Sequence, residues 1–225
     1  MKKWKRWLLI GIVGTVVAVV GGPFAYIHLF EGTAAAPLAL STAQPSQVMI
    51  NGPLDGTWNI ASGSVAGYRV KEVLFGQSAT AVGRTSSITG SLVVSGTTVK
   101  SGTVTVDMAS VTSDRSMRDN QFRGRIMDTS SYPTATFTFG NPVVVGSVPG
   151  EGATGTYTVT GQLTLHGVTR TVTVTLSGRR TASQFQISGS IPITFADYDI
   201  ANPSFGPAQT EDHGVLEFSL NFSHA

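Results

Sequence analysis

GQLTLHGVTRTVTVTL, residues 161–176, contains two alternating stretches on either side of His166-Gly167. Leucine or valine recurs at every second position of each stretch except at Arg170, and most positions between them carry threonine. Successive side chains of a strand point to opposite faces, so each stretch predicts a strand with one apolar face. A short break that ends in glycine is typical of a hairpin turn. We therefore expect two antiparallel strands that reverse direction at His166-Gly167.

The same period of two recurs from Thr57 to the end of the chain. Turn signals such as Ser95-Gly96 and Gly178-Arg179 separate the alternating stretches. About eight strands with one apolar face each must bury that face, either as two stacked sheets or as one sheet closed into a barrel. The apolar faces of the clearest strands lie within residues 104–108, 137–139, 163–165, 172–176, 191–195 and 216–222.

One segment, SDRSMRDNQFRGRIM at 113–127, interrupts the alternation. Ser116 and Asp119 have the spacing of a capping box, and Phe122 and Ile126 have the i, i+4 spacing of one helix face. Pro133 prevents a helix from continuing into the strand that follows. We expect one short helix here.

The first thirty residues predict a membrane anchor. Residues 1–6, MKKWKR, carry four positive charges, and residues 7–30 carry none. About 20 apolar residues cross a bilayer as a helix, and the basic tip stays in the cytoplasm. The alternative is a secreted protein whose signal peptide is cleaved after Ala34-Ala35-Ala36. Residues 31–54, rich in small residues and proline, indicate a flexible linker before a domain at 55–225.

Composition restricts the chemistry of the exported part. The 225-residue chain has no cysteine, which excludes disulfides, thiolate metal sites and a cysteine nucleophile. Without residues 1–31, 11 basic residues face 12 acidic ones, a net charge of −1. A domain with this balance has no overall positive field, so we expect no nucleic-acid partner.

Four stretches occur in order along the chain: DGTWNIASGSVAGYRV (55–70), VDMASVTSDRSMRDNQF (106–122), YPTATFTF (132–139) and TGQLTLHGVTRTVTVTL (160–176). Together they resemble the YceI-like family, the polyisoprenoid-binding group of lipocalin-like barrels, over residues 55–222. The resemblance implies an all-β fold, an antiparallel barrel of about eight strands with one short helix, around a long apolar cavity for a polyprenyl or other lipid-like chain. The sequence departs from soluble members at Ala61-Ser62 and at 68–72, where those members carry histidines, and it looks closer to membrane-tethered members.

Strand parity and the family architecture together predict the residues that line this cavity. Arg118 and His166 are candidates for its rim. We expect neither a catalytic residue nor a metal site, and no cofactor other than a bound isoprenoid lipid or quinone. The predicted lining residues are Tyr68, Val70, Leu74, Phe122, Phe137, Phe139, Leu163, Leu165, Ile193 and Phe195.

The function we expect is non-catalytic binding or transport of a polyprenol or quinone type of lipid outside the cytoplasmic membrane. One alternative is a structural or partner-binding module whose core is filled by its own side chains. The other is an enzyme that acts on a bound lipid through His166 or Asp197. No nucleophile or orienting carboxylate lies near His166 in sequence, so a role in the turn is favoured. Asp197, Asp199 and Asn202 do not fit a calcium loop, because Ala201 takes the fifth position.

Overall fold

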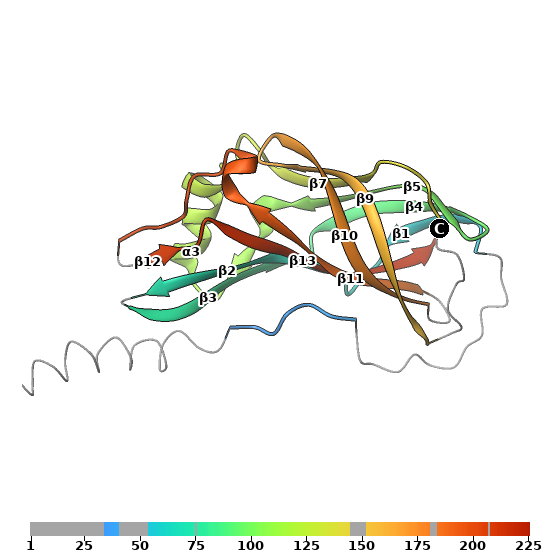
Figure 1. The fold of residues 1–225 in the computed structure, drawn as a ribbon, viewed down its shortest axis with the longest axis horizontal. Helices are drawn as coiled ribbons and strands as arrows, with labels where there is room; N and C mark the ends of the chain where they lie inside the picture. The colour runs from blue at the N-terminus through green and yellow to red at the C-terminus, as the bar shows by residue number, and fades with distance from the viewer. Residues whose placement is uncertain (1–33, 41–53, 75, 145–151, 181–183, 207) are drawn as a thin grey trace, which may run out of the picture.

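The structure is a computed structural model that describes residues 34–40, 54–74, 76–144, 152–180, 184–206 and 208–225 (Figure 1). The predicted basic tip and anchor, residues 1–30, lie outside the described residues, as does most of the predicted linker. Within the described part of the chain, no helix has both the length and the apolar character needed to cross a bilayer.

Two long strands of the barrel are each interrupted near the middle. β1 (Gly56–Ile60) and β2 (Val65–Leu74) both pair with β13 (His213–His224), so they form successive halves of one strand. β3 (Gln77–Thr85) pairs with β2 and β4 (Ile88–Ser95) pairs with β1, so they form the two halves of the next strand. Each interruption lets the strand bend around the barrel.

The remaining long strands complete a closed antiparallel ring. From β4 the order runs through β5, β7, β9, β10 and β11 to β13, which returns to β1. Closure leaves one continuous wall, which rules out two stacked sheets and confirms the predicted barrel of eight strands (Figure 1). These strands are β5 (Thr98–Asp107), β7 (Thr134–Phe139), β9 (Thr154–Leu165), β10 (Val168–Arg180) and β11 (Gln184–Thr194); the short β6 (Thr112–Ser113), β8 (Val143–Val144) and β12 (Ala208–Thr210) pair with β3, β5 and β2.

The hairpin predicted at His166-Gly167 is confirmed. β9 and β10 pair in continuous register from Leu165 opposite Val168 to Thr154 opposite Arg179. His166 has φ +50° and Gly167 has φ +77°, the conformation that a two-residue type I′ turn requires. The alternation of residues 161–176 therefore places Leu163, Leu165, Val174 and Leu176 inside the barrel, where all of them are buried.

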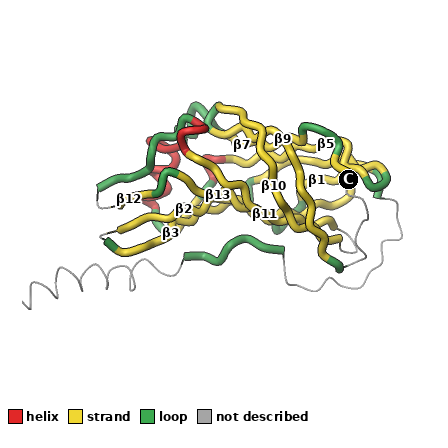
Figure 2. The backbone as a smooth tube through the Cα atoms, in the orientation of Figure 1, coloured by secondary structure: helices red, strands yellow, loops and turns green. Residues whose placement is uncertain are grey.

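The helical segments gather at one end of the barrel, which we call the α3 end (Figure 2). The predicted short helix is confirmed as α3 (Ser116–Gln121), continued by a π-helical turn, η3 (Phe122–Ile126). The predicted capping box is wrong. Arg115 is the N-cap residue, and the Asp119 carboxylate accepts hydrogen bonds from the Ser113 backbone N–H (2.8 Å) and hydroxyl (2.6 Å). This pairing closes the loop before α3.

The alternating stretch at 191–195 ends one residue earlier than predicted. β11 stops at Thr194, and Phe195 begins a 3₁₀ turn, η4 (Phe195–Tyr198). A second 3₁₀ turn, η2 (Met108–Ser110), follows β5 and begins with the Asp107 carboxylate accepting from the Ala109 N–H. Phe195 and Met108 still face the interior and are buried, because each turn begins on the inward side of the strand before it.

The interior contains two apolar clusters. The first lines the α3 end and includes Met108, Phe122, Leu165 and Phe195. The second fills the opposite end around Trp58, whose indole packs against Phe185 with ring centroids 4.3 Å apart. Because this second cluster closes the barrel bottom, we call that end the closed end.

Residues 34–40, which we call the strap, lie along the outside of the barrel beneath β2 and β3 (Figure 1). Arg69 donates to the Ala35 carbonyl, Arg84 donates to the Ala36 carbonyl, and the Leu38 N–H donates to Glu217. No pattern in the sequence predicts these contacts, because an irregular proline-containing segment is typical of a linker.

Glu217 is the centre of the strap's docking site. Its side chain is only 3% exposed although it points outward from β13, and its carboxylate pairs with Arg84 (2.7 Å) and Arg69 (3.3 Å). The strap covers this cluster. The Glu217 carboxylate therefore links Arg69 of β2 and Arg84 of β3 to the strap.

Candidate ligand-binding cavity

A cavity of about 530 Å³ lies inside the barrel. Small-molecule sites typically have about 300–1,000 Å³. All ten residues predicted from strand parity and the family architecture line it. Arg118 also lines the cavity, whereas the other candidate rim residue, His166, does not. The filled-core alternative does not agree with an interior of this size.

The cavity runs from an exposed mouth at the α3 end to a buried bottom. At the mouth, Met117 and Phe205 line the cavity and are 73% and 60% exposed. At the bottom, Leu220 and Phe222 are buried, Phe222 completely. As the described residues form it, the cavity therefore has an exposed end at the mouth and a buried, apolar end opposite.

Glycines keep the aromatic rings of the wall out of the lumen. A Cβ at Gly83 would lie 2.3 Å from the Tyr68 ring, and a Cβ at Gly161 would lie 2.4 Å from the Phe137 ring. Each ring therefore lies over the bare backbone of a neighbouring strand. The space at the centre of the barrel remains because these large side chains lie along its wall.

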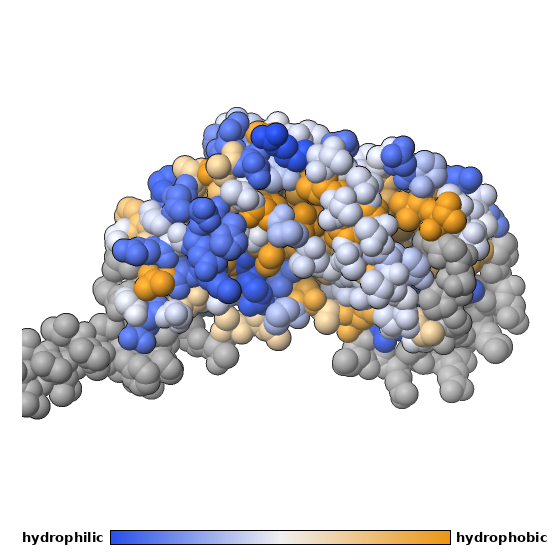
Figure 3. Space-filling view, viewed as in Figure 1, coloured by the Kyte–Doolittle hydropathy of each residue, from blue (hydrophilic) through white to orange (hydrophobic). Residues whose placement is uncertain are grey.

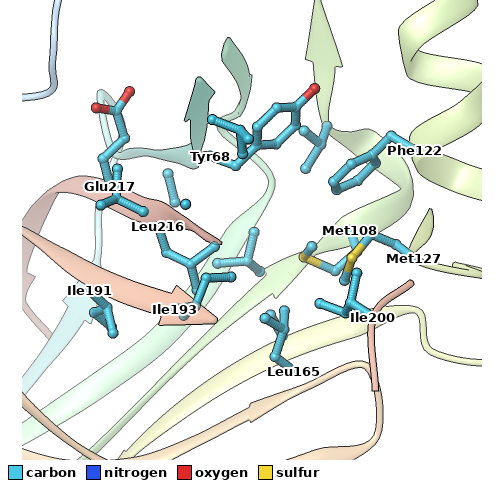
Figure 4. A pocket seen from close by; sticks show the side chains of 18 of the residues that line it. Tyr68, Met108, Phe122, Met127, Leu165, Ile191, Ile193, Ile200, Leu216 and Glu217 are labelled. Carbon is cyan, nitrogen blue, oxygen red and sulfur yellow. The ribbon is translucent and has the colours of Figure 1, made fainter. Parts of the chain in front are cut away.

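The part of the cavity at the α3 end is formed by residues from several elements (Figure 4). Tyr68 and Phe122 face one another there, with ring centroids 5.1 Å apart and planes 15° from parallel. Met108, Met127 and Ile200 surround the same space. Sequence analysis missed Met127 and Ile200 as lining residues because both follow a helical turn, where neither strand parity nor helix spacing assigns a face.

The mouth combines this apolar wall with one partly buried charge network. Glu72 lines the cavity and its carboxylate lies 3.3 Å from the Arg118 guanidinium, which also pairs with Asp114. Burial by itself would lower the pKa of Arg118, but Asp114 and Glu72 outweigh it and raise that pKa above its usual value. Arg118 is therefore a fixed cation at the mouth. Sequence analysis missed Glu72, although alternation with Tyr68, Val70 and Leu74 was the available signal.

Tyr68 supplies a neutral polar group beside this network. Burial raises the pKa of its phenol well above the usual value, and the smaller opposite effect of Arg118 does not reverse this. The hydroxyl thus keeps its proton at physiological pH and can donate a hydrogen bond to a ligand head group.

The residues proposed for the enzymatic alternative lie elsewhere. His166 Nδ1 is 3.1 Å from the Tyr198 carbonyl oxygen, and its ring packs against Tyr132. Asp197 is exposed and its backbone carbonyl accepts from Arg170. Neither residue lines the cavity. Across the described ranges, no group of three or more His, Cys, Asp or Glu side chains could hold a metal ion.

Comparison with known proteins agrees with this architecture. No match is found among curated proteins. A polyisoprenoid binding domain from Saccharophagus degradans, implicated in plant cell wall breakdown, is similar in structure with a TM-score of 0.62 at 17% identity; the match covers 76% of this chain and 99% of that one. BcnA of Burkholderia cenocepacia matches with a TM-score of 0.53 at 22% identity, over 68% and 95% of the two chains. Residues 58–222 match the YceI-like domain, and the chain therefore belongs to the YceI-like family.

Proposed function

We propose that this protein binds an isoprenoid-type lipid, such as a polyprenol or a quinone, in its barrel cavity and carries it without catalysing a reaction. The observation that supports this most strongly is the 530 Å³ cavity with an almost wholly apolar wall and one exposed mouth. The polyisoprenoid binding domain of Saccharophagus degradans has a similar fold. That likeness supports the same class of ligand here.

The chain length of the ligand follows from the energetics of burial. Burying one methylene contributes about 0.8 kcal/mol, so a five-carbon isoprene unit contributes roughly 3–4 kcal/mol. Association costs about 4–15 kcal/mol, and micromolar binding requires a net of about −8 kcal/mol. One or two buried units would bind weakly, whereas four or more would bind usefully. The ligand should therefore be a chain that extends toward Phe222, with its polar head near Tyr68, Glu72 and Arg118.

The experiment for this proposal is mass spectrometry of organic extracts from the purified protein. We expect an isoprenoid lipid at about one molecule per chain, or uptake to that level after incubation with a series of polyprenols and quinones. Protein that releases no lipid and retains none of the added series would contradict the proposal. Such a result would instead favour a structural or partner-binding module.

We also propose that the barrel lies outside the cytoplasmic membrane and stays attached to it through residues 7–30. The basis is the sequence alone: four basic residues precede an uncharged stretch long enough to cross a bilayer. N-terminal sequencing of the mature protein, together with protease accessibility of the barrel in spheroplasts, tests both parts. A mature chain that begins at Pro37 would replace the anchor with a cleaved signal peptide.

A further inference from the structure

The rim of the cavity exposes apolar side chains that a water-facing surface does not need. Met117 on α3 and Phe205 in the loop before β12 are both mostly exposed, and both line the mouth. Hydrophobic groups lie among strongly hydrophilic ones at this end of the molecule (Figure 3). Isolated exposed apolar residues are common, but two that border the opening of an apolar cavity form a continuous path from surface to lumen.

Two arginines with neutral partners lie on η3, the turn that continues α3. Arg123 donates to the Asn120 side-chain oxygen (3.0 Å), and Arg125 donates to the Gln121 side-chain oxygen (3.1 Å) and the Pro203 carbonyl (2.9 Å). The Arg125 guanidinium also lies 5.7 Å from the centre of the Phe205 ring. Among the residues that the structure describes, the recorded partners of both arginines are neutral, which leaves their positive charges available to phosphate groups at a lipid surface. We call Met117, Arg123, Arg125 and Phe205 the mouth surface.

The strap determines which end of the barrel is nearer to the chain that precedes it. At its start, the strap contacts Arg69 of β2 through Ala35. Near its end, Ala39 contacts Ser219, whose partner on β2 is Val65, four residues before Arg69. Since β2 runs toward the mouth and ends there at Leu74, the strap enters from the mouth side. Arg69, whose guanidinium contacts Ala35, lies five residues, or about 17 Å along the strand, before Leu74.

The connection to the proposed anchor is short. Five residue steps separate Phe30, the last residue of that anchor, from Ala35, and they span at most about 18 Å when extended. This length is similar to the distance along β2 from Arg69 to Leu74 at the mouth. The closed end is farther from Arg69 than the mouth is. Val215 pairs with Arg69, and β13 runs nine more residues from Val215, about 30 Å, to its end at the closed end of the barrel. A chain held by the strap can therefore bring the mouth to the membrane but not the closed end.

From these observations we propose that the mouth surface docks on the anionic bilayer into which the chain is anchored. Met117 and Phe205 enter the interface, and Arg123 and Arg125 contact lipid phosphates. An isoprenoid chain then passes between bilayer and cavity along an apolar path without crossing water. This inference rests on the proposed anchor and ligand, and it adds the surface and the orientation by which the protein would exchange that ligand.

The absence of cysteine allows a direct test by site-specific labelling of the full chain. M117C and F205C place an environment-sensitive fluorophore at the mouth, and S95C places it at the last residue of β4, beside the β4–β5 turn at the closed end. Each protein is reconstituted into vesicles of phosphatidylcholine and phosphatidylglycerol with a spin-labelled lipid as quencher. We expect quenching at 117 and 205 at least twofold stronger than at 95. Equal quenching at both ends, or stronger quenching at 95, would overturn the proposal.

Charge variants test the arginines separately. R123Q/R125Q in the M117C protein should lower the ratio of docked to undocked barrels by about 10–30-fold, because a basic residue near an anionic surface contributes on the order of 1 kcal/mol. K100Q/R180Q removes the same charge near the closed end and should leave quenching at 117 unchanged. Unchanged quenching in R123Q/R125Q would refute the role of these arginines.

The lipid content of the same vesicle-reconstituted protein separates this inference from the proposed function. Protein that carries an isoprenoid but shows no selective quenching at the mouth refutes membrane docking alone. Protein whose mouth is quenched but which takes up no isoprenoid refutes the ligand and leaves the docking surface in place.

Discussion

Placing an aromatic ring in the cavity by Ala135→Phe should weaken ligand binding without unfolding the barrel. Ala135 is buried on β7, lines the cavity, and belongs to the cluster at the α3 end. Its methyl group faces the cavity, so a larger side chain would extend into the lumen. The matched control is Thr138→Phe, which adds the same ring to an exposed, outward position of the same strand.

The size of the effect follows from the space that the ring takes. A phenyl ring has six carbons and would displace about one five-carbon isoprene unit, whose burial contributes roughly 3–4 kcal/mol. At 1.4 kcal/mol per factor of ten, affinity should fall by about 10²–10³-fold. The change in unfolding free energy should stay within the roughly 1–3 kcal/mol typical of overpacking, because the ring enters a cavity.

Equilibrium binding of a labelled polyprenol to the two variants and the unchanged protein measures this difference, and thermal unfolding verifies that each variant is folded. We expect Thr138→Phe to bind within about twofold of the unchanged protein. If Ala135→Phe is folded and binds equally well, the lipid does not occupy this part of the barrel and the argument from cavity burial fails.

Three further predictions concern depth, the hairpin turn and pH. Ala66 lines the cavity within the cluster at the closed end, so Ala66→Phe should weaken binding of long polyprenols while short ones bind normally. An equal loss of affinity for polyprenols of all lengths would contradict this. His166→Ala loses the contact with Tyr198 and strains a positive φ, so it should lower the unfolding free energy by about 1–2 kcal/mol without changing lipid content, whereas His166→Asn should retain most of the stability. The raised pKa of Tyr68 means that the folded state holds the phenol proton more tightly than the unfolded state does. The resulting contribution of Tyr68 to the free energy of unfolding is complete below about pH 10 and is lost as pH rises further. In urea unfolding from pH 8 to 11, the free energy of unfolding should fall less for Tyr68→Phe than for the unchanged protein. An identical fall with pH in the two proteins would refute the raised pKa of Tyr68.

Much of the fold could be predicted from the sequence because period-two alternation reports directly on which side of a wall each residue faces. The hairpin at His166-Gly167 and the inward positions of Leu163 and Leu165 follow from that rule. The predicted lining residues on strands face the cavity for the same reason, Phe122 lines it from a helical turn, and the contact of all ten with a ligand stays a prediction. The rule stops where strands end, which is why Phe195 was assigned to a strand although it begins a turn.

Other parts of the site depend on contacts between distant segments, which no local pattern encodes. Phe205 reaches the mouth from an irregular loop, and the strap docks on Glu217 through Arg69 and Arg84. Asp119 was expected to cap its own helix but bonds to Ser113, because the loop before α3 folds back within reach of its carboxylate. Sequence spacing identifies candidate partners, and only the folded chain decides between them.

The most direct test of the central claim is an experimentally determined structure of the protein with a long-chain polyprenol or quinone. We predict one continuous chain inside the barrel, with its head group near Tyr68 and Arg118 and its tail reaching toward Phe222. A ligand held only on the outer wall, or a barrel whose side chains have closed the lumen, would contradict the account.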